Sequence, residues 1–232
     1  MSATAHGTAQ FRPASDNSLL IYFDQRISLD AHQQVAKLLR LLELQPVSGI
    51  VNLHPAYCSV LVKFDTLKFR HDEVETRLRP YLDRLDEVIL PEPRHREIPV
   101  CYGGEYGPDL AEVCDTNRLS LQQAIDLHVS ATYIVYFLGF VPGFAYLGGL
   151  PEALLTPRLA VPRRRVPPGS VAIAGQQSGV YPFNTPGGWR LIGRTPLAMF
   201  RPDRDAMNFL SIGDRVHFTP ISPEQFTALE NA

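Results

Sequence analysis

The sequence is poor in cysteine and in net charge, and it has no long apolar run. Its 232 residues include three cysteines, with no CxxC pair, which indicates free thiols in a reducing compartment. No apolar run approaches the roughly 20 residues that span a bilayer. The first residues lack the basic and apolar regions of a secretory signal. We therefore expect a cytoplasmic protein with no membrane association.

Several common site signatures are also missing. Neither glycine-rich phosphate motif, G-x-x-x-x-G-K-[ST] or G-x-G-x-x-G, occurs, and neither does the G-x-S-x-G elbow of serine hydrolases. The seven histidines show no spacing that suits a metal ion. A formal net charge of −2 provides no general attraction to nucleic acid. We expect no bound metal, no nucleic-acid partner and no self-sufficient nucleotide loop.

Glycine and proline are instead abundant in one stretch. Ten of the 16 glycines and nine of the 20 prolines lie in the 58 residues 139–196. That composition alone favours disorder, but aromatic side chains recur through it, and a disordered linker has little use for them. These aromatics are Phe140, Phe144, Tyr146, Tyr181, Phe183 and Trp189. The mixture predicts a folded surface of tight turns with buried rings, and we interpret it as the functional face.

Apolar periodicity predicts a smaller α+β domain at residues 15–93, after a flexible tail at 1–14. Its expected strands are 18–23, 49–53, 57–64 and 88–90, and its expected helices start at Leu29 and span 72–85, where Pro80 should kink or split the second. The order β-α-β-β-α-β is the ferredoxin-like pattern. Polar, turn-rich residues 91–96 mark the boundary with the next domain.

The second domain, residues 94–222, is expected to be almost purely β after two short helices, and a tail at 223–232 follows it. The helices are predicted at 108–115 and 120–128, the latter with a capping box made by Ser120 and Gln123. The expected strands are 98–102, 133–138, 171–174, 190–193, 197–200 and 215–219. Many short strands at close spacing favour a barrel or a sandwich.

His128 shares the apolar face of the helix expected at 120–128 and lies at its C-terminal end. The helix dipole there would favour the protonated imidazole. A satisfied core histidine is the ordinary interpretation of such a position. The alternative is a ring that points into a cleft where the glycine-rich loops converge, and the sequence leaves both open.

Arginines and polar groups of the glycine-rich stretch are further candidates. Arg158, Arg163, Arg164 and Arg165 form the only dense basic run, bracketed by prolines. Solvated charges are the default, but Arg163 or Arg165 could face inward and clamp a carboxylate or phosphate. Gln176, Tyr181 and Trp189 stand beside glycine turns. That arrangement suits either a shallow pocket or a packed barrel end.

The ordered motifs of residues 97–218 resemble the allophanate hydrolase subunit 1/KipI family, and the N-terminal half resembles it loosely. The motifs are IPV at 98, YGG at 102, GPDL at 107, LH at 127, FLGFxPGFxYLG at 137, PR at 162, VPxGSV at 166, GxQxGxYP at 175 and TPGGW at 185. The resemblance implies a C-terminal cyclophilin-like β-barrel domain after a ferredoxin-like N-terminal α+β domain.

The resemblance also implies one component of an ATP-dependent 5-oxoprolinase, which cleaves 5-oxo-L-proline to L-glutamate. The implied partners are a subunit 2/KipA-type protein (the C subunit) and a LamB/YcsF-type protein (the A subunit), with ATP and its Mg²⁺ counter-ion as cofactor and little activity of this chain alone. Opening a lactam needs cations or hydrogen-bond donors near developing negative charge, so we predict His128, Arg163 and Gln177 as catalytic. The predicted pocket comprises Phe140, Phe144, Tyr146, Gln176, Tyr181 and Trp189.

Two other functions stay open from the same resemblance. A KipI-like inhibitor of a histidine kinase would dock through the apolar, proline-rich face. A carboxyltransferase half of a urea carboxylase or allophanate hydrolase-type system would work with a biotin-bearing enzyme. No isolated marker in the sequence decides among the three.

Overall fold

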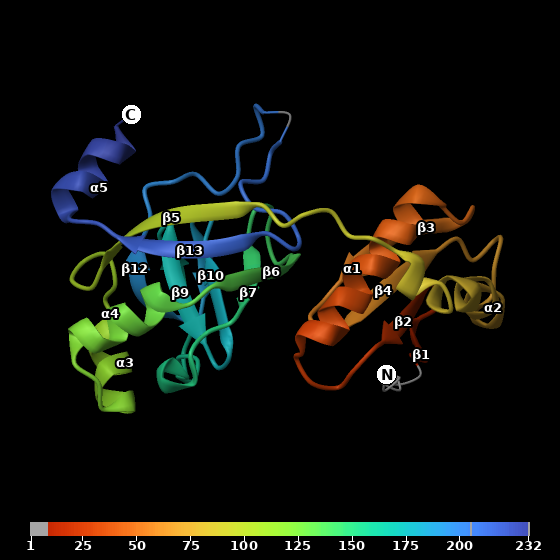
Figure 1. The fold of residues 1–232 in the computed structure, drawn as a ribbon, viewed down its shortest axis with the longest axis horizontal. Coiled ribbons are helices and arrows are strands. Elements are labelled where there is room, and N and C mark those ends of the chain that lie inside the picture. The colour runs from red at the N-terminus through yellow and green to blue at the C-terminus, as the bar shows by residue number, and fades with distance from the viewer. Residues whose placement is uncertain (1–8, 205, 232) are drawn as a thin grey trace. The chain divides into compact units, whose positions relative to one another are not determined.

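The computed structural model describes residues 9–204 and 206–231. The chain divides into two compact units between Glu92 and Pro93 (Figure 1), within the polar segment 91–96 that is expected to be the boundary. Each unit has a hydrophobic core of its own. None of the helices in the described residues is both long enough and apolar enough to cross a membrane.

The N-terminal unit is an antiparallel sheet with two helices packed on it. The strands are β1 (Gln10–Ser15), β2 (Ser18–Tyr22), β3 (Ile50–Pro55) and β4 (Ser59–Phe64), in the order β1-β2-β4-β3. The helices are α1 (Leu29–Leu44) and α2 (His71–Leu82), and the 3-10 turn η1 (Leu85–Glu87) follows. Leu38 of α1 and Leu78 of α2 meet Ile21 of β2 in the core. Apolar residues at helical spacing thus face the sheet, as the periodicity predicts.

The predicted β-α-β-β-α-β order is wrong at both ends. Strand β1 begins at Gln10, inside the expected tail, and no strand forms at 88–90. β1 pairs antiparallel with β2 and takes the edge position that the last strand of a ferredoxin-like sheet would occupy. Its side chains are almost all exposed, so it has no apolar alternation to reveal it. Pro80 does not divide α2, which ends two residues after it at Leu82.

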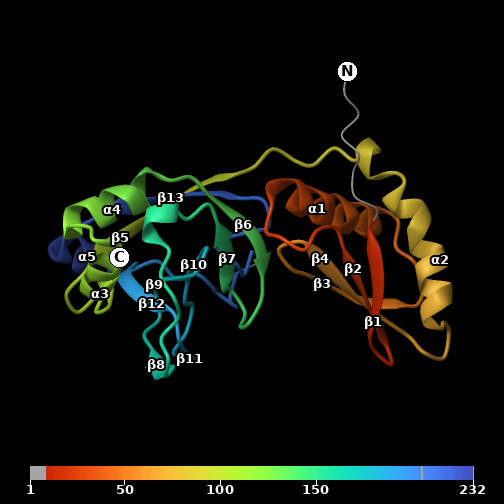
Figure 2. The same cartoon turned by 90° about the horizontal axis from the view of Figure 1, so that it is seen from below.

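The C-terminal unit is a closed seven-stranded barrel (Figures 1 and 2), which confirms the predicted barrel. Its strands are β5 (His95–Tyr102), β6 (Tyr133–Leu138), β7 (Ala145–Gly148), β9 (Ser170–Ala174), β10 (Gln177–Val180), β12 (Arg190–Arg194) and β13 (Arg215–Pro220). Around the barrel they run β10-β7-β6-β13-β5-β12-β9, and β13 lies parallel to β5. Residues such as Ile98, Val171 and Phe218 fill the core.

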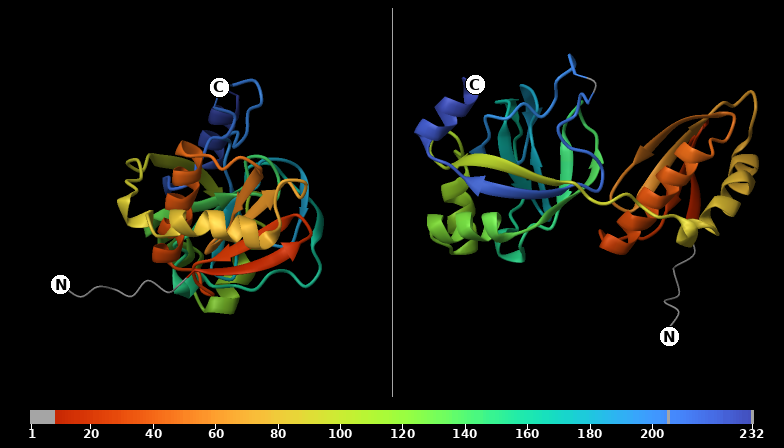
Figure 3. Two further views of the ribbon diagram at one scale, coloured as in Figure 1. Left: turned by 90° about the vertical axis from the view of Figure 1, so that its right-hand side faces the viewer. Right: turned by 45° about the horizontal axis from the view of Figure 1, so that its top comes forward.

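Helices and a separate ribbon complete this unit. The helices are α3 (Leu110–Asn117), α4 (Leu121–Ser130) and α5 (Pro223–Glu230), and η2 (Glu152–Leu154) is a 3-10 turn. α4 packs along β13 (Figure 3). β8 (Arg163–Val166) and β11 (Thr185–Gly187) pair as a two-stranded ribbon that extends from the barrel (Figure 2).

Three expectations about the C-terminal unit need correction. Strands β7, β8, β10 and β11 form inside the glycine- and proline-rich stretch, where only turns were expected between 138 and 171 and between 174 and 190. Residues 197–200 make a single bridge, Phe200 to Asn208, and no strand. The expected tail at 223–232 contains α5. A capping box of Ser222 and Gln225 starts this helix, and Phe226, 2% exposed, anchors it.

Candidate functional site

An aromatic pocket of about 210 Å³ lies beside the β8–β11 ribbon. It is lined by Phe140, Phe144, Tyr146, Arg158, Leu159, Pro162, Tyr181, Pro186, Gly187, Gly188 and Trp189. The structure therefore brings together five of the six pocket residues that the sequence predicts. Pockets for drug-sized ligands begin at roughly 300 Å³, so this one suits a smaller molecule.

The aromatic rings of the pocket form one packed cluster around Phe144. The centroid of the Phe144 ring lies 4.9 Å from that of Tyr146, 5.1 Å from Tyr181 and 5.5 Å from Trp189, all edge to face. Phe144, Tyr181 and Trp189 are buried. Edge-to-face contacts restrict the ring orientations, so the walls are formed before any ligand arrives.

Two glycines allow the rings to approach the backbone. A Cβ at Gly187 would lie 2.5 Å from the hydroxyl oxygen of Tyr181, and one at Gly179 would lie 2.9 Å from the Phe144 ring. Neither distance leaves room for a side chain. Glycine is required at these positions by close packing against the pocket rings.

Arg158 is the one charged residue among those that line the pocket in the described chain. Its guanidinium carbon lies 5.8 Å from the centroid of the Trp189 ring, within cation–π range. Its Nη2 donates a hydrogen bond of 3.3 Å to Oε1 of Gln177. Arg158 belongs to the basic run in which Arg163 or Arg165 was expected to face inward. Proline spacing predicts an extended loop, whereas the structure has bends at Ala160 and Val161. The spacing does not show which arginine faces the rings.

Arg163 is paired with a buried carboxylate and does not line the pocket. Its Nη2 donates to Oδ1 of Asp109 at 2.5 Å, and Oδ2 of Asp109 accepts the backbone N–H of Leu191 at 2.7 Å. Asp109 is only 5% exposed. The pair connects β8 with the start of α3 and with β12. Arg163 thus holds the ribbon that forms one pocket wall, and its catalytic role stays a prediction.

The two glutamines differ in position. Gln177 begins β10 and contacts the pocket through Arg158. Gln176 is exposed in the turn between β9 and β10 and does not line the pocket, which corrects the sequence expectation. The turn contains Gly175 at φ +55°, so the chain reverses direction at this point and carries Gln176 outward.

His128 is a buried core residue between α4 and β13. Its Nδ1 lies 2.8 Å from the Tyr102 hydroxyl, and its ring centroid is 4.5 Å from that of Phe218. Burial lowers the pKa of His128 to about 3, so the imidazole is neutral and the expected stabilisation of its protonated form is wrong. Desolvation outweighs the helix dipole here. His128 is not among the residues that line the aromatic pocket.

Tyr181 is an uncharged hydroxyl at the wall of the pocket. Burial raises its pKa to about 12, although the Trp189 backbone, Arg158 and Arg163 act in the opposite direction. Tyr181 therefore keeps its proton at neutral pH. It can act as a hydrogen-bond donor or acceptor but brings no charge to the site.

The aromatic pocket, as the described residues line it, does not fit ATP and its Mg²⁺. In the described part, no group of three or more His, Cys, Asp or Glu side chains is placed to hold a metal ion. The aromatic pocket offers one guanidinium and a small volume. A nucleoside triphosphate needs several donors for its phosphates and oxygen ligands for the cation.

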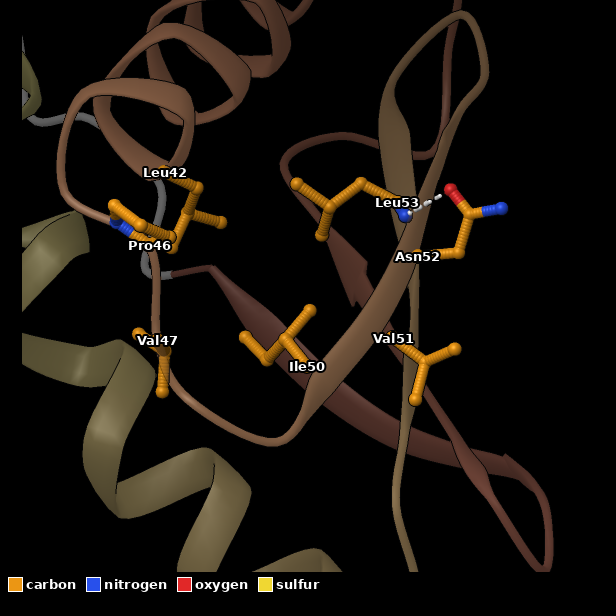
Figure 4. Close-up of a pocket in the computed structure, with 7 residues that line it drawn as sticks. All are labelled: Leu42, Pro46, Val47, Ile50, Val51, Asn52 and Leu53. Carbon is orange, nitrogen blue, oxygen red and sulfur yellow. Dashed lines mark hydrogen bonds between the residues drawn. The ribbon is translucent and has the colours of Figure 1, made fainter.

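Two other hollows lack groups that could perform chemistry. One of about 260 Å³ lies in the N-terminal unit, where Leu42, Ile50 and Leu53 point toward one another and Asn52 points away (Figure 4). A larger one, about 360 Å³, lies between the glycine turn at 103–107 and helices α3 and α4. Its polar side chain, Tyr102, already contacts His128. Neither hollow is lined by a charged residue, so we take the aromatic pocket as the candidate site.

The chain is similar to known proteins along most of its length. The family described as "Carboxyltransferase domain, subdomain C and D" matches residues 9–210. The 5-oxoprolinase B subunit of Bacillus subtilis (strain 168) is 41% identical over 229 residues, which cover 94% of this chain and 95% of the relative. The 5-oxoprolinase B subunit of Escherichia coli O157:H7 is 58% identical over 134 residues, covering 58% of this chain and 62% of the relative.

Solved structures share the fold. The crystal structure of TTHA0988 superposes with a TM-score of 0.75 at 35% identity, and the match covers 90% of this chain but only 40% of TTHA0988. The urea amidolyase of K. lactis superposes with a TM-score of 0.82 at 20% identity over 98% of this chain and 16% of that one, which shows the fold alone. The family match and the identities together show that the chain belongs to the family of the 5-oxoprolinase B subunits, within the carboxyltransferase C and D subdomains.

Proposed function

We propose that this chain is the B subunit of a 5-oxoprolinase that cleaves 5-oxo-L-proline to L-glutamate at the expense of ATP. The observation that carries the proposal is the 41% identity with a 5-oxoprolinase B subunit over 94% of this chain and 95% of the relative. The aromatic pocket is compatible with it, because a small cavity with aromatic walls and one cation suits a small ring-containing acid.

The proposed enzyme contains other subunits, as the name of the relatives indicates. We assign a KipA-type protein (the C subunit) and a LamB/YcsF-type protein (the A subunit) as the partners, in the cytoplasm. Because the aromatic pocket of this chain does not fit ATP, we place most of the nucleotide site on a partner. Little activity is expected from this chain alone.

Within this proposal the chain binds and orients the lactam. The neutral hydroxyl of Tyr181 is available as a donor toward negative charge that develops on the lactam oxygen. Gln177 accepts a hydrogen bond from Arg158 beside the rings, and Asp109 holds Arg163 in the adjoining ribbon. Direct catalytic roles for His128, Arg163 and Gln177 remain predictions.

Reconstitution with omission tests the proposal. The three subunits from one source are combined with ATP, Mg²⁺ and 5-oxo-L-proline, and L-glutamate and ADP are measured with each of them left out in turn. We expect glutamate only from the full mixture. A rate that is unchanged without this chain would contradict the proposal.

A second candidate is a carboxyltransferase that works with a biotin-bearing enzyme. It is favoured by the carboxyltransferase family match and by 24% identity with the urea amidolyase of Saccharomyces cerevisiae, over 92% of this chain and 13% of that protein. Supplying a biotin carboxylase and a carboxylated biotin carrier to the same mixture distinguishes the two. Transfer of the carboxyl group from carboxybiotin to an added amide, without glutamate formation, would favour this second function.

A further inference from the structure

Arg158 differs from its neighbours Arg163 and Arg190 in its lack of a carboxylate partner among the described residues. Arg163 pairs with Asp109, and Arg190, which donates to the carbonyl of Pro157, pairs with Glu112. No carboxylate in residues 9–204 and 206–231 lies within ion-pair distance of Arg158. This guanidinium contacts a ring face and one amide oxygen at the aromatic pocket, and no carboxylate of the described residues neutralises its charge.

The free donors of Arg158 match a carboxylate. A guanidinium has five N–H donors in a planar fork whose geometry fits a carboxylate bidentately, and Gln177 accepts from only one nitrogen. The neighbouring surfaces of the pocket are the rings of Trp189 and Tyr146, 5.8 Å apart between centroids. The uncharged Tyr181 does not repel an anion. The pocket thus presents one anion-binding group next to aromatic walls.

We propose that Arg158 binds the carboxylate of a small ring-containing carboxylic acid whose ring packs against Trp189 and Tyr146. Naming that acid as 5-oxo-L-proline rests on the proposed function. Gln177 is the positioning residue, because its amide oxygen orients the guanidinium over the pocket. Binding energy from a charge-assisted, bidentate pair is lost when either charge is removed.

Steady-state kinetics of the assembled enzyme tests the role of Arg158. In Arg158→Gln we expect the KM for 5-oxo-L-proline to rise about 10- to 100-fold, with kcat changed less than about threefold. Arg164→Gln is the matched control, because Arg164 is an exposed arginine of β8 that does not line the pocket. An equal KM in wild type and Arg158→Gln, with turnover intact, would overturn this inference and leave the proposed function standing.

Binding to the full chain, measured by calorimetry, separates the two proposals. Wild type should bind 5-oxo-L-proline at least about 10-fold more tightly than 5-oxo-L-prolinamide, and Arg158→Gln should bind the two alike. If the reconstituted enzyme shows no turnover, pyrrole-2-carboxylate and its amide serve as probes. An Arg158-dependent preference for that acid would then support this inference while the proposed function fails. Equal binding of the acid and the amide to wild type would overturn the inference about Arg158.

A steric variant locates the ligand. At Gly188 the three atoms nearest to an added Cβ all belong to Pro162, the closest at 3.6 Å. This is ordinary contact, so Gly188→Ala should fold normally while it narrows the pocket. We expect the acid and the amide to lose about the same factor in affinity, on the order of 10-fold. Unchanged affinity for both would show that the ligand binds elsewhere, and the inference would be wrong.

Discussion

The two units of the molecule bury polar groups very differently. Among the described residues of the N-terminal unit, the buried polar side chains are Ser18, His32 and Ser59, and none is a carboxylate. The barrel unit buries Asp109, Asp214 and His128 together with several hydroxyls. Both carboxylates accept bonds from an arginine and a backbone N–H, as buried charge requires. The first unit therefore depends on apolar packing, and the second also depends on specific polar pairs.

The hollows of the two units follow the same contrast. The hollow beside Leu42 and Ile50 has apolar walls with Asn52 turned away from it (Figure 4). The aromatic pocket adds Arg158 to its rings, and the Asp109–Arg163 pair holds its ribbon. Polar pairing inside the barrel unit thus supports a site that can recognise a charged ligand, while the N-terminal unit offers shape alone.

The largest expected effect lies in the apolar core of the N-terminal unit. Leu38→Ala in α1 removes a side chain with 0% exposure and should lower the free energy of unfolding of this unit by about 4 kcal/mol through the cavity it leaves. Hydrogen exchange of backbone amides in residues 9–92 measures the loss. Leu44→Ala is the control, because Leu44 ends the same helix and is 59% exposed, and it should change stability by less than about 0.5 kcal/mol.

The single tryptophan of the chain allows the unfolding of the barrel unit to be measured separately from that of the N-terminal unit. Trp189 belongs to the barrel unit, so its fluorescence in a urea titration follows that unit. We expect Leu38→Ala to leave this transition close to that of wild type. If Leu38→Ala lowers the free energy of unfolding from Trp189 fluorescence as much as that from hydrogen exchange of residues 9–92, the two units unfold together.

The next effect concerns the buried carboxylate beside the pocket. Asp109→Asn removes the charge that faces Arg163 and turns an amide donor toward the Leu191 N–H or the guanidinium. It should destabilise the barrel unit by about 3 kcal/mol, as measured by Trp189 fluorescence in urea. Because the pair holds the β8–β11 ribbon, KM for 5-oxo-L-proline should also rise in the folded enzyme.

Asp214→Asn is the matched control for the ribbon. Asp214 accepts bonds from Arg94 and from the backbone of Ser211, and neither residue lines the pocket. This variant should lose stability and keep a wild-type KM. If both variants alter KM equally, the Asp109–Arg163 pair has no special role in shaping the site.

The smallest effect is a pH dependence from His128. Its pKa of about 3 in the folded state is below the value of about 6.5 for an unfolded chain, so protons bind preferentially to the unfolded state. The stability contributed by the neutral ring is complete above about pH 6.5 and falls as the pH drops toward 3. Between about pH 7 and pH 5 the barrel unit should lose about 2 kcal/mol in urea titrations.

His128→Phe removes the titrating group while it keeps an aromatic ring in the core. The variant is expected to be less stable at neutral pH, because the Tyr102 hydroxyl loses its partner. Its stability should nevertheless vary less with pH than that of wild type. Parallel pH profiles for the two proteins would show that His128 is not the source of the acid sensitivity.

Much of the fold follows from patterns that are local in the sequence. Leu38 in α1 and Leu78 in α2 each belong to a series of apolar residues at helical spacing. The capping box of Ser120 starts α4 as predicted. Strand β1 escaped prediction because its exposed side chains carry no alternation. Strands β7 and β10 escaped because their glycines weaken strand signals, although pairing with neighbours in the barrel satisfies their backbone.

The candidate site was predictable in part for a related reason. Aromatic residues among glycines indicated that a ring-lined surface exists, and Phe144, Tyr181 and Trp189 do pack together. Which arginine lines that surface was not predictable. Arg158 and Arg163 lie five residues apart in one proline-rich segment, and only the positions of Trp189 and Asp109 distinguish their surroundings.

By itself, the sequence determined the family, the helices with regular apolar spacing and the presence of an ordered aromatic surface, because these depend on residue types at short, fixed intervals. The tertiary structure decided which polar side chains pair with each other. Asp109 meets Arg163 across 54 positions and Tyr102 meets His128 across 26, so neither pairing has a local signature. Packing of α3, α4 and the β8–β11 ribbon against the barrel brings these groups together and buries His128, and burial then sets its charge. Among the described residues, Arg158 is left at the pocket without a carboxylate partner.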